Sequence, residues 1–361
     1  MKLAIFSAKP YDKLYLTSAR ATELDPASDI DVVYHEFALS PETVSLAAGA
    51  TAVCVFVNDT LNAAVLTSLH KLGVRFVLLR CAGYNNVDLE AAAELGLAVA
   101  NVPSYSPEAV AEFAVALIQT LNRNTHRAYN RVREANFALA GLLGRTLHGK
   151  TVGVVGTGRI GVAFARIMAG FGCKLLAYDV YPNDDFKALG TYVDLGTLLR
   201  ESDIVSLHCP LTPQTKHLMN ATTLAQMKTG AMLVNTSRGG LIDTKAVIAA
   251  LKRAHLGGLA LDVYEGEGSL FYTDHSGTIV EDDELMRLTT FHNVLVCGHQ
   301  AFFTEEALRE IADVTVRNLA ALARGDECKN ALVVPGRGSD GNRESGKGGL
   351  LSRKDSVPIR V

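Results

Sequence analysis

The stretch TVGVVGTGRIGVAFARIMAGFG, residues 151–172, decides how the second half of this chain folds. A β-branched run leads into Gly156, Gly158 and Gly161, and a segment of helical periodicity follows at once. The first glycine permits a tight turn, the second lets a pyrophosphate approach the backbone, and the third permits close packing of the helix. The stretch therefore predicts a strand, a turn and a helix whose N-terminus faces the phosphates of a dinucleotide.

The next apolar run, KLLAYD, ends on Asp179. An acid at this spacing accepts hydrogen bonds from the ribose hydroxyls of a bound dinucleotide. A carboxylate also repels a 2′-phosphate, and the following Val180 and Tyr181 bring no cation. We therefore expect NAD rather than NADP. There are two alternatives to a dinucleotide site. The glycines could form a strand-to-helix turn that binds no cofactor, or a related sheet could bind a methyl-donor cofactor.

Short apolar runs alternate with helical segments along most of the chain. The runs are LAIF, DVVYH, AVCVFV, FVLLR and LAVAN in the first hundred residues, then TVGVVG, KLLAYD, DIVSLHC, AMLVNT, LGGLALDV and NVLVCG. Such alternation predicts parallel sheets covered by helices. We expect an α/β fold of two domains, a flavodoxin-like substrate domain and a Rossmann NAD-binding domain, with a ligand cleft between them.

Two helical segments indicate where the chain passes between the domains. A long helix is expected to start at Ser106, with Pro107 in its first turn. The amphipathic segment 303–323 follows the last strand and is expected to pack back on the first domain. The expected domains are 1–102 (substrate domain, first part), 103–298 (NAD-binding domain), 299–334 (return to the substrate domain) and 335–361 (disordered tail).

Composition favours a small ligand over a polymer. The chain has 361 residues, 48% of them hydrophobic, and a formal charge of −3, so neither nucleic acid nor an anionic membrane is an expected partner. No apolar run reaches the roughly 20 residues of a membrane span, and the N-terminal one is too short for a signal peptide. The six cysteines form no C-x-x-C pair. We expect a cytoplasmic protein with reduced thiols and no metal site.

Three chemically suited residues follow the last three apolar runs. Arg238 follows the fourth run of the second series, Glu267 the fifth and His299 the sixth. Parallel strands end at one edge of a sheet, so these side chains should converge there. A guanidinium grips a carboxylate, and an imidazole whose charged form a carboxylate favours can donate a proton. Taken singly, each could be a solvated or structural side chain; together they predict a catalytic group.

The motifs GTGRIG, HCPLT, NTSRGGLID, DVYEGE and GHQAF, in this order, resemble the D-isomer-specific 2-hydroxyacid dehydrogenases. The stretches VFVND, RCAGYNNVDL, VPSYSPEAVAE and NRNTHRAY are similar, more narrowly, to bacterial fermentative NAD-dependent D-lactate dehydrogenases. The resemblance covers roughly residues 1–333 and leaves the tail outside the family pattern. It implies reversible reduction of pyruvate to D-lactate by NADH.

The resemblance also implies roles for individual residues. Arg238 would hold the substrate carboxylate, His299 would donate the proton, and Glu267 would pair with His299, with Glu265 as a bystander. Besides the three glycines and Asp179, the implied cofactor residues are Arg159, Ile160, Cys209, Pro210, Thr215, Thr236, Ser237 and Asp262. The further implied substrate residues are Ala82, Gly83, Tyr105 and Phe302. His208 is interpreted as structural.

Other functions remain open from the sequence. A dehydrogenase of the same family could act on hydroxypyruvate, phosphoglycerate or a bulkier 2-keto acid. A protein of another class, an NADH-sensing scaffold, could keep the same residues. The basic run NRNTHRAYNRVR is expected to be a solvated helix face or a subunit contact, and the resemblance implies a homodimer or homotetramer.

Overall fold

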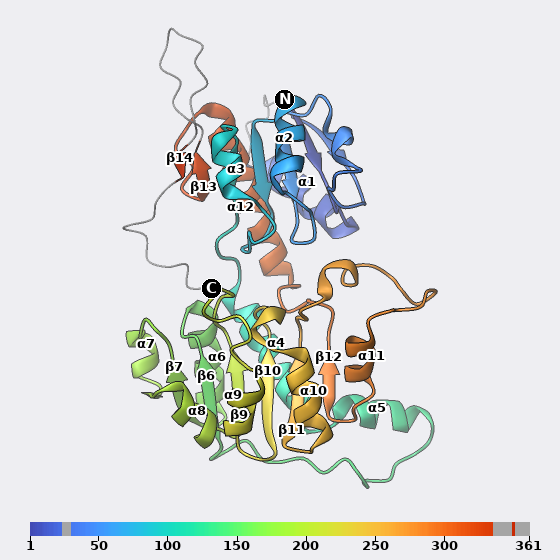
Figure 1. Cartoon of the computed structure of the whole chain (residues 1–361), viewed down its shortest axis with the longest axis vertical. Coiled ribbons are helices and arrows are strands. Elements are labelled where there is room, and N and C mark those ends of the chain that lie inside the picture. The colour runs from blue at the N-terminus through green and yellow to red at the C-terminus, as the bar shows by residue number, and fades with distance from the viewer. Residues whose placement is uncertain (24–29, 335–348, 351–361) are drawn as a thin grey trace. The chain divides into compact units, whose positions relative to one another are not determined.

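The computed structural model describes residues 1–23, 30–334 and 349–350. They form two compact units (Figure 1). Unit 1 holds Met1–Ser106 and the described residues from Thr304 onward, and unit 2 holds Pro107–Phe303. Each unit is built on one seven-stranded sheet. The domain boundaries expected from the sequence stay a prediction.

The sheet of unit 1 contains the five apolar runs of the first hundred residues as parallel strands. Its order is β14-β13-β5-β4-β3-β1-β2. The parallel strands are β1 (Lys2–Ile5), β2 (Asp31–Tyr34), β3 (Ala52–Val55), β4 (Phe76–Leu79) and β5 (Ala98–Ala100). Helices α1 (Pro10–Glu23) and α12 (Glu305–Arg324) share one core cluster with these strands. Helices α2 (Ala63–Lys71) and α3 (Leu89–Glu94) pack against each other.

One edge of this sheet departs from the expectation of purely parallel strands. β13 (Ala331–Val334) runs antiparallel to β5, and β14 (Gly349–Leu350) runs antiparallel to β13. The run ALVV is short and adjoins a Gly- and Ser-rich segment, so the alternation of strands and helices did not reveal it. β14 also falls within the tail expected to be disordered; the remaining tail residues lie outside the described part of the chain.

The described sheet of unit 2 is parallel throughout, with the order β12-β11-β10-β9-β6-β7-β8. Its strands are β6 (Thr151–Val155), β7 (Lys174–Tyr178), β8 (Thr191–Tyr192), β9 (Ile204–Leu207), β10 (Ala231–Asn235), β11 (Leu256–Leu261) and β12 (Val294–Val296). The six expected runs are all strands here, and the sequence missed only the two-residue edge strand β8. The predicted α/β fold is confirmed.

Helices cover both faces of the unit 2 sheet, because the strands contribute to two separate core clusters. One cluster includes residues of α8 (Leu195–Glu201), α9 (Ala221–Gln226), α10 (Thr244–Lys252) and α11 (Asp283–Thr289). The other includes α4 (Pro107–Asn122) and α6 (Arg159–Gly170). Residues buried on both faces explain why these strands are almost continuously apolar. No helix in the described residues is long and apolar enough to cross a membrane.

The long helix expected from Ser106 is two helices. α4 begins at Pro107 as predicted, but Asn124 adopts a left-handed backbone conformation with φ of 52° and ends the regular run. A second helix, α5 (Thr125–Arg133), follows and buries none of its residues. Asparagine tolerates this conformation better than most residues, so the backbone at Asn124 can turn between a largely buried helix and an exposed one.

Candidate active site

The glycine turn between β6 and α6 has no room for side chains. Gly156 has φ of +94°, and a Cβ there would lie 2.6 Å from the backbone N of Cys209. A Cβ on Gly161 would collide with the carbonyl oxygen of Gly156. Gly158 is the N-cap of α6 and offers no side chain to the first turn. The N–H groups of Arg159 and Ile160 in that turn therefore remain open to an anion, as a pyrophosphate requires.

Asp179 lies beside this turn, at the end of β7. Its Oδ2 accepts hydrogen bonds from the backbone N (2.6 Å) and Oγ1 (2.9 Å) of Thr157, and its Oδ1 accepts from the backbone N of Tyr181 (2.8 Å). These bonds fix the carboxylate without neutralising it, and no ion pair to Asp179 occurs among the described residues. A carboxylate oxygen can accept further hydrogen bonds, so the position fits ribose hydroxyls and disfavours a 2′-phosphate.

Polar side chains that follow the next two strands, β9 and β10, lie at the same edge of the sheet. Ser237 donates from Oγ to the carbonyl of Cys209 (2.7 Å), and Thr215 donates from Oγ1 to the carbonyl of Pro210 (2.7 Å). Thr236 is 7% exposed, and its buried Oγ1 has no hydrogen-bond partner in the described structure. A buried hydroxyl without a partner is costly, which suits a position that a bound ligand would satisfy. The residues present fit a dinucleotide.

His299 and Glu267 form a direct pair. Nδ1 of His299 lies 2.8 Å from Oε1 of Glu267, and the two side chains are 17% and 22% exposed. The second carboxylate oxygen of Glu267 accepts from the backbone N of Tyr264 (2.8 Å). Since Nδ1 binds the carboxylate, the imidazole leaves Nε2 to act on a ligand, and no hydrogen bond occupies Nε2 in the described chain. This arrangement suits a proton donor.

The backbone around His299 is fixed by Asp262, which follows β11. The N–H of His299 donates to the carbonyl of Asp262 (2.7 Å), and the Asp262 carboxylate accepts from the backbone N of Gln300 (2.8 Å) and Ala301 (2.9 Å). Burial raises the pKa of Asp262. These bonds hold His299 at a positive φ of 53°. The structural role of Asp262 was not evident from the sequence; its predicted contact with the cofactor stays a prediction.

Arg238 follows β10, the strand next to β11. Its Nη1 donates to the carbonyl of Ser237 (2.7 Å), and no carboxylate pairs with it in the part of the chain described. A Cβ on the neighbouring Gly239 would overlap the backbone of Tyr264 and Glu265. The absence of a side chain at Gly239 therefore lets the Arg238 turn contact the segment that carries Glu267.

The remaining predicted residues are distributed over both units. Phe302 is 8% exposed in unit 2, and its ring contacts Phe303 edge to face with centroids 6.1 Å apart. Ala82, Gly83 and Tyr105 belong to unit 1, where the carbonyl of Ala82 accepts from Asn101 Nδ2 (2.8 Å). Their meeting with the unit 2 residues stays a prediction.

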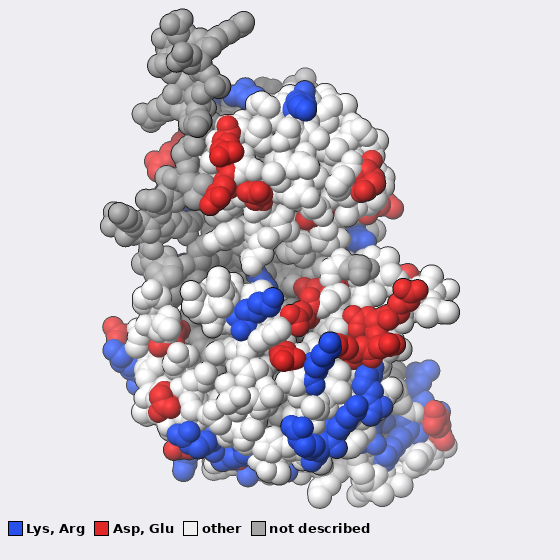
Figure 2. Space-filling model, in the orientation of Figure 1, with Lys and Arg blue, Asp and Glu red and all other residues white. Residues whose placement is uncertain are grey.

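Two further histidines have partners of their own. His208 is 3% exposed, bonds Ser206 Oγ through Nε2 (2.9 Å), and has a pKa lowered to about 3 by burial, so it remains neutral. Glu265, the expected bystander, pairs with His217 at 2.7 Å on the surface. This second pair was not predicted from the sequence. Figure 2 shows acidic and basic side chains interspersed over the face in view, with acidic ones over α11.

Known proteins are similar to this chain along nearly its whole length. Residues 115–301 match the family model described as D-isomer specific 2-hydroxyacid dehydrogenase, NAD binding domain. A D-lactate dehydrogenase of Curvularia clavata is 66% identical over 346 residues, which cover 96% of this chain and 99% of that protein. A 2-hydroxyacid dehydrogenase A of Aspergillus oryzae is 66% identical over 361 residues, all of both chains. That match includes the tail, which the sequence placed outside the family pattern.

Solved structures show the same similarity. The apo-structure of D-lactate dehydrogenase from Escherichia coli superimposes with a TM-score of 0.83 at 51% identity, covering 92% of this chain and all of that one. An NAD-complexed D-isomer specific 2-hydroxyacid dehydrogenase from Lactobacillus delbrueckii gives a TM-score of 0.75 at 32% identity, covering 92% of this chain and 99% of that one. The NAD cofactor predicted from the sequence is confirmed.

Proposed function

Because the chain belongs to the D-isomer-specific 2-hydroxyacid dehydrogenase family, we propose that it interconverts pyruvate and D-lactate with NAD as its cofactor. The observation that carries the proposal is the His299–Glu267 pair at 2.8 Å, formed after β12 and β11 at the edge of the sheet where β10, the strand before Arg238, also ends. Relatives named D-lactate dehydrogenase at 66% and 53% identity support this substrate over others.

Each of the three residues has one task in the reduction of pyruvate. Arg238 binds the carboxylate and draws electron density from the keto oxygen. His299, protonated, donates the Nε2 proton to that oxygen as it gains negative charge. Glu267 stabilises the imidazolium and fixes its tautomer through Nδ1. Bound NADH supplies the hydride, so that pyruvate, NADH and a proton give D-lactate and NAD⁺.

Residues outside the catalytic trio would set the substrate and hold the cofactor. Backbone amides of Ala82 and Gly83 would bind the same carboxylate, and the rings of Tyr105 and Phe302 would enclose the methyl group. Aromatic walls around a methyl group would favour pyruvate over bulkier 2-keto acids, since added side-chain volume must displace them. For the cofactor, the open first turn of α6 supports the pyrophosphate site.

A substrate panel tests the proposal. NADH consumption is measured with pyruvate, hydroxypyruvate, phosphohydroxypyruvate and 2-ketoisocaproate, and the product acid is resolved on a chiral column. We expect the highest kcat/KM with pyruvate and the D-enantiomer of lactate. A higher value for another 2-keto acid would make the protein a dehydrogenase of that acid. No turnover of any of them, with NADH still bound, would favour an NADH-sensing scaffold.

We also propose that the protein forms a homodimer or homotetramer through the segment 129–143. Five large apolar side chains in it are exposed to solvent: Tyr129 (62%), Val132 (51%), Phe137 (73%), Leu139 (83%) and Leu143 (94%). Scattered apolar residues are normal on surfaces, but five within one segment are typical of an interaction site. A second copy is the partner we propose, since symmetric association is the commonest arrangement of soluble oligomers.

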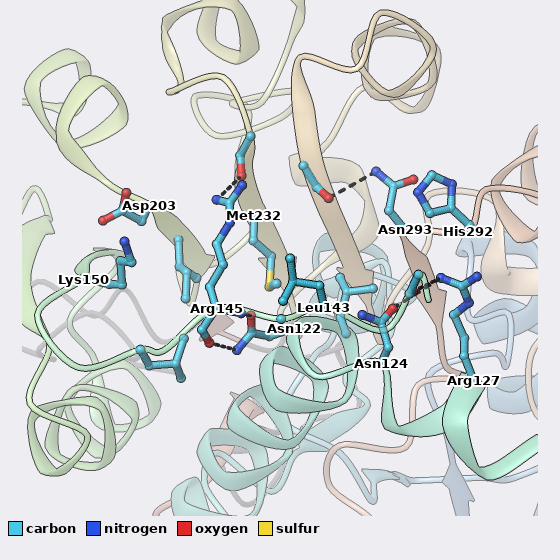
Figure 3. A pocket seen from close by; sticks show the side chains of 17 residues that line it. Asn122, Asn124, Arg127, Leu143, Arg145, Lys150, Asp203, Met232, His292 and Asn293 are labelled. Atoms are coloured by element: carbon cyan, nitrogen blue, oxygen red, sulfur yellow. Dashed lines mark hydrogen bonds between the residues drawn. The ribbon is translucent and has the colours of Figure 1, made fainter. Parts of the chain in front are cut away.

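Hydrogen bonds fix the chain just before and just after this segment. The side chain of Asn122 donates to the carbonyl of Arg145 (2.8 Å) and accepts from its N–H (3.1 Å), and Arg145 Nη1 donates to the carbonyl of Gly230 (3.2 Å). Leu143 lies beside a cavity of about 270 Å³, near Met232 (Figure 3). The cavity is at the amino ends of β9, β10 and β12, opposite the edge that carries the reacting groups.

Light scattering during size-exclusion chromatography tests the assembly. The wild type should elute as a dimer or tetramer, and the double variant Leu139→Glu, Leu143→Glu should shift toward the monomer, because burying two charges in an apolar interface is costly. Ile279→Glu, at a site 92% exposed outside the segment, is the control that should not shift. A wild-type monomer would refute the assembly.

We further propose that the protein works in the cytoplasm. None of the six cysteines forms a disulfide in the described structure and four of them are buried, as suits a reducing compartment. Cell fractionation, with the protein detected by an antibody, should recover it in the cytoplasmic fraction. Recovery from an oxidising compartment would contradict the proposed location.

A further inference from the structure

Tyr272 has a backbone conformation that tyrosine rarely adopts. It lies between η3 (Glu267–Ser269) and α11, with φ of +68°. The left-handed region is disfavoured for a bulky residue and persists only where the surroundings impose it. His299, its neighbour in space, also has a positive φ, 53°. Two strained residues in contact at a reacting centre indicate that their relative placement matters.

Tyr272 contacts His299 in two ways. The two ring centroids are 5.7 Å apart, with 38° between the ring planes. The Tyr272 hydroxyl donates to the backbone carbonyl of His299 (3.3 Å). The first contact places the tyrosine ring against the imidazole in a tilted arrangement, and the second holds the backbone from which the imidazole projects. Neither contact uses Nε2, the nitrogen left for a ligand.

We propose that Tyr272 is a positioning residue for the proton donor His299, an inference that rests on the proposed function. Glu267 fixes the ring at Nδ1, and Asp262 fixes the backbone N–H. Those bonds leave the tilt of the imidazole plane least restrained, and the Tyr272 ring limits it. Nε2 is thereby kept directed at one point in space, as proton transfer to a small ketone requires.

The aromatic ring also favours the charged donor. A cation within about 6 Å of an aromatic centroid is attracted by the ring, and the centroid separation here is 5.7 Å. The charged groups that act on His299 are the carboxylates of Glu267 and Asp262, and the guanidinium of Arg238 follows β10, two strands away in the sheet. The uncharged Tyr272 ring, like the two carboxylates, stabilises the protonated form of the imidazole. Removing the Tyr272 ring should therefore reduce the rate of pyruvate reduction at high pH, where less of His299 is protonated.

The test compares Tyr272→Phe, which keeps the ring, with Tyr272→Leu, which removes it. We expect Tyr272→Phe to retain kcat within about 3-fold, since it loses one long hydrogen bond. Tyr272→Leu should lose about 10-fold or more in kcat, with NADH affinity unchanged, because misorientation affects the chemical step. The high-pH limit of pyruvate reduction should move to lower pH in Tyr272→Leu alone.

A double-variant comparison separates positioning from plain structural support. In a His299→Gln background the donor is gone, so adding Tyr272→Leu should cost little further activity; a structural role would cost as much as in the wild type. Tyr272→Met, which also lacks a ring but has a longer and more flexible side chain, replaces the leucine variant if that one does not fold.

The proton titration of the His299 ring, followed by NMR and identified by its loss in His299→Gln, gives a readout that needs no turnover. Its midpoint should fall in Tyr272→Leu. An unchanged midpoint and pH profile, with kcat within about 2-fold of wild type, would overturn the inference. Equal losses in Tyr272→Phe and Tyr272→Leu would overturn it as well. A wild type inactive toward every 2-keto acid would instead refute the proposed function.

Discussion

Replacing Glu267 by glutamine should move the pH range in which the protein reduces pyruvate. The wild-type carboxylate accepts two hydrogen bonds, one from His299 Nδ1 and one from the backbone N of Tyr264, both 2.8 Å long. Glutamine has one oxygen and one NH₂ group in place of the two oxygens. One of the two donors must then face another donor, so the substitution removes a charge and leaves one N–H unpaired.

The magnitude follows from the burial of the pair. Both side chains are less than a quarter exposed, at 17% and 22%, so solvent screens their interaction only in part. A hydrogen bond to a charged group contributes about 1.5–3 kcal/mol, whereas a neutral one contributes about 1 kcal/mol. The imidazolium should therefore lose about 0.5–2 kcal/mol of stabilisation. Because the charged donor is needed for reduction, its loss moves the high-pH limit of activity downward.

The assay is kcat/KM for pyruvate between about pH 5 and 10 at saturating NADH, the range over which imidazole groups titrate. Glu265→Gln is the matched control, since Glu265 lies two residues away and pairs with the surface residue His217 instead. Its profile should coincide with that of the wild type. An unmoved limit in Glu267→Gln, or the same shift in both variants, would refute the pairing as the cause.

Three further outcomes are expected. His299→Gln should lower kcat for pyruvate by about 10²–10⁴-fold while NADH still binds, the usual contribution of a positioned acid, and near wild-type turnover would remove His299 from the mechanism. Gly161→Ala should reduce NADH affinity by about 10-fold, measured by fluorescence titration, because its Cβ meets the carbonyl of Gly156; unchanged affinity would contradict the close approach. Asp12→Ala should lower the free energy of unfolding in urea by about 3–5 kcal/mol, since it leaves the charge of Arg80, 2% exposed, without its partner; a loss below about 1 kcal/mol would contradict this.

The sequence revealed the sheets well because buried parallel strands are continuous apolar runs. All eleven runs identified from the sequence are strands in the structure. Two features were not predicted: the antiparallel pairing of β13 with β5 and the two-residue strand β8. Neither strand alternates with a helix or contains a long apolar run. The break at Asn124 escaped because it depends on one backbone angle within an otherwise helical pattern.

Among the site residues, topology alone indicated which edge of the sheet would carry the reacting groups. Parallel order brings the ends of β10, β11 and β12 together, and the pairing of His299 with Glu267 follows. The contacts of Tyr272 could not be foreseen, since a loop residue approaches His299 only once the loop has folded. The partner of Glu265 was hidden for the same reason.

A crystal structure with NAD and oxamate, the unreactive amide analogue of pyruvate, tests the central claim most directly. We predict that the oxamate carboxylate binds the Arg238 guanidinium and that its keto-equivalent oxygen lies within hydrogen-bond distance of His299 Nε2. Oxamate bound away from both side chains, or a His299 ring turned so that Nδ1 faces it and Glu267 is left alone, would contradict the account.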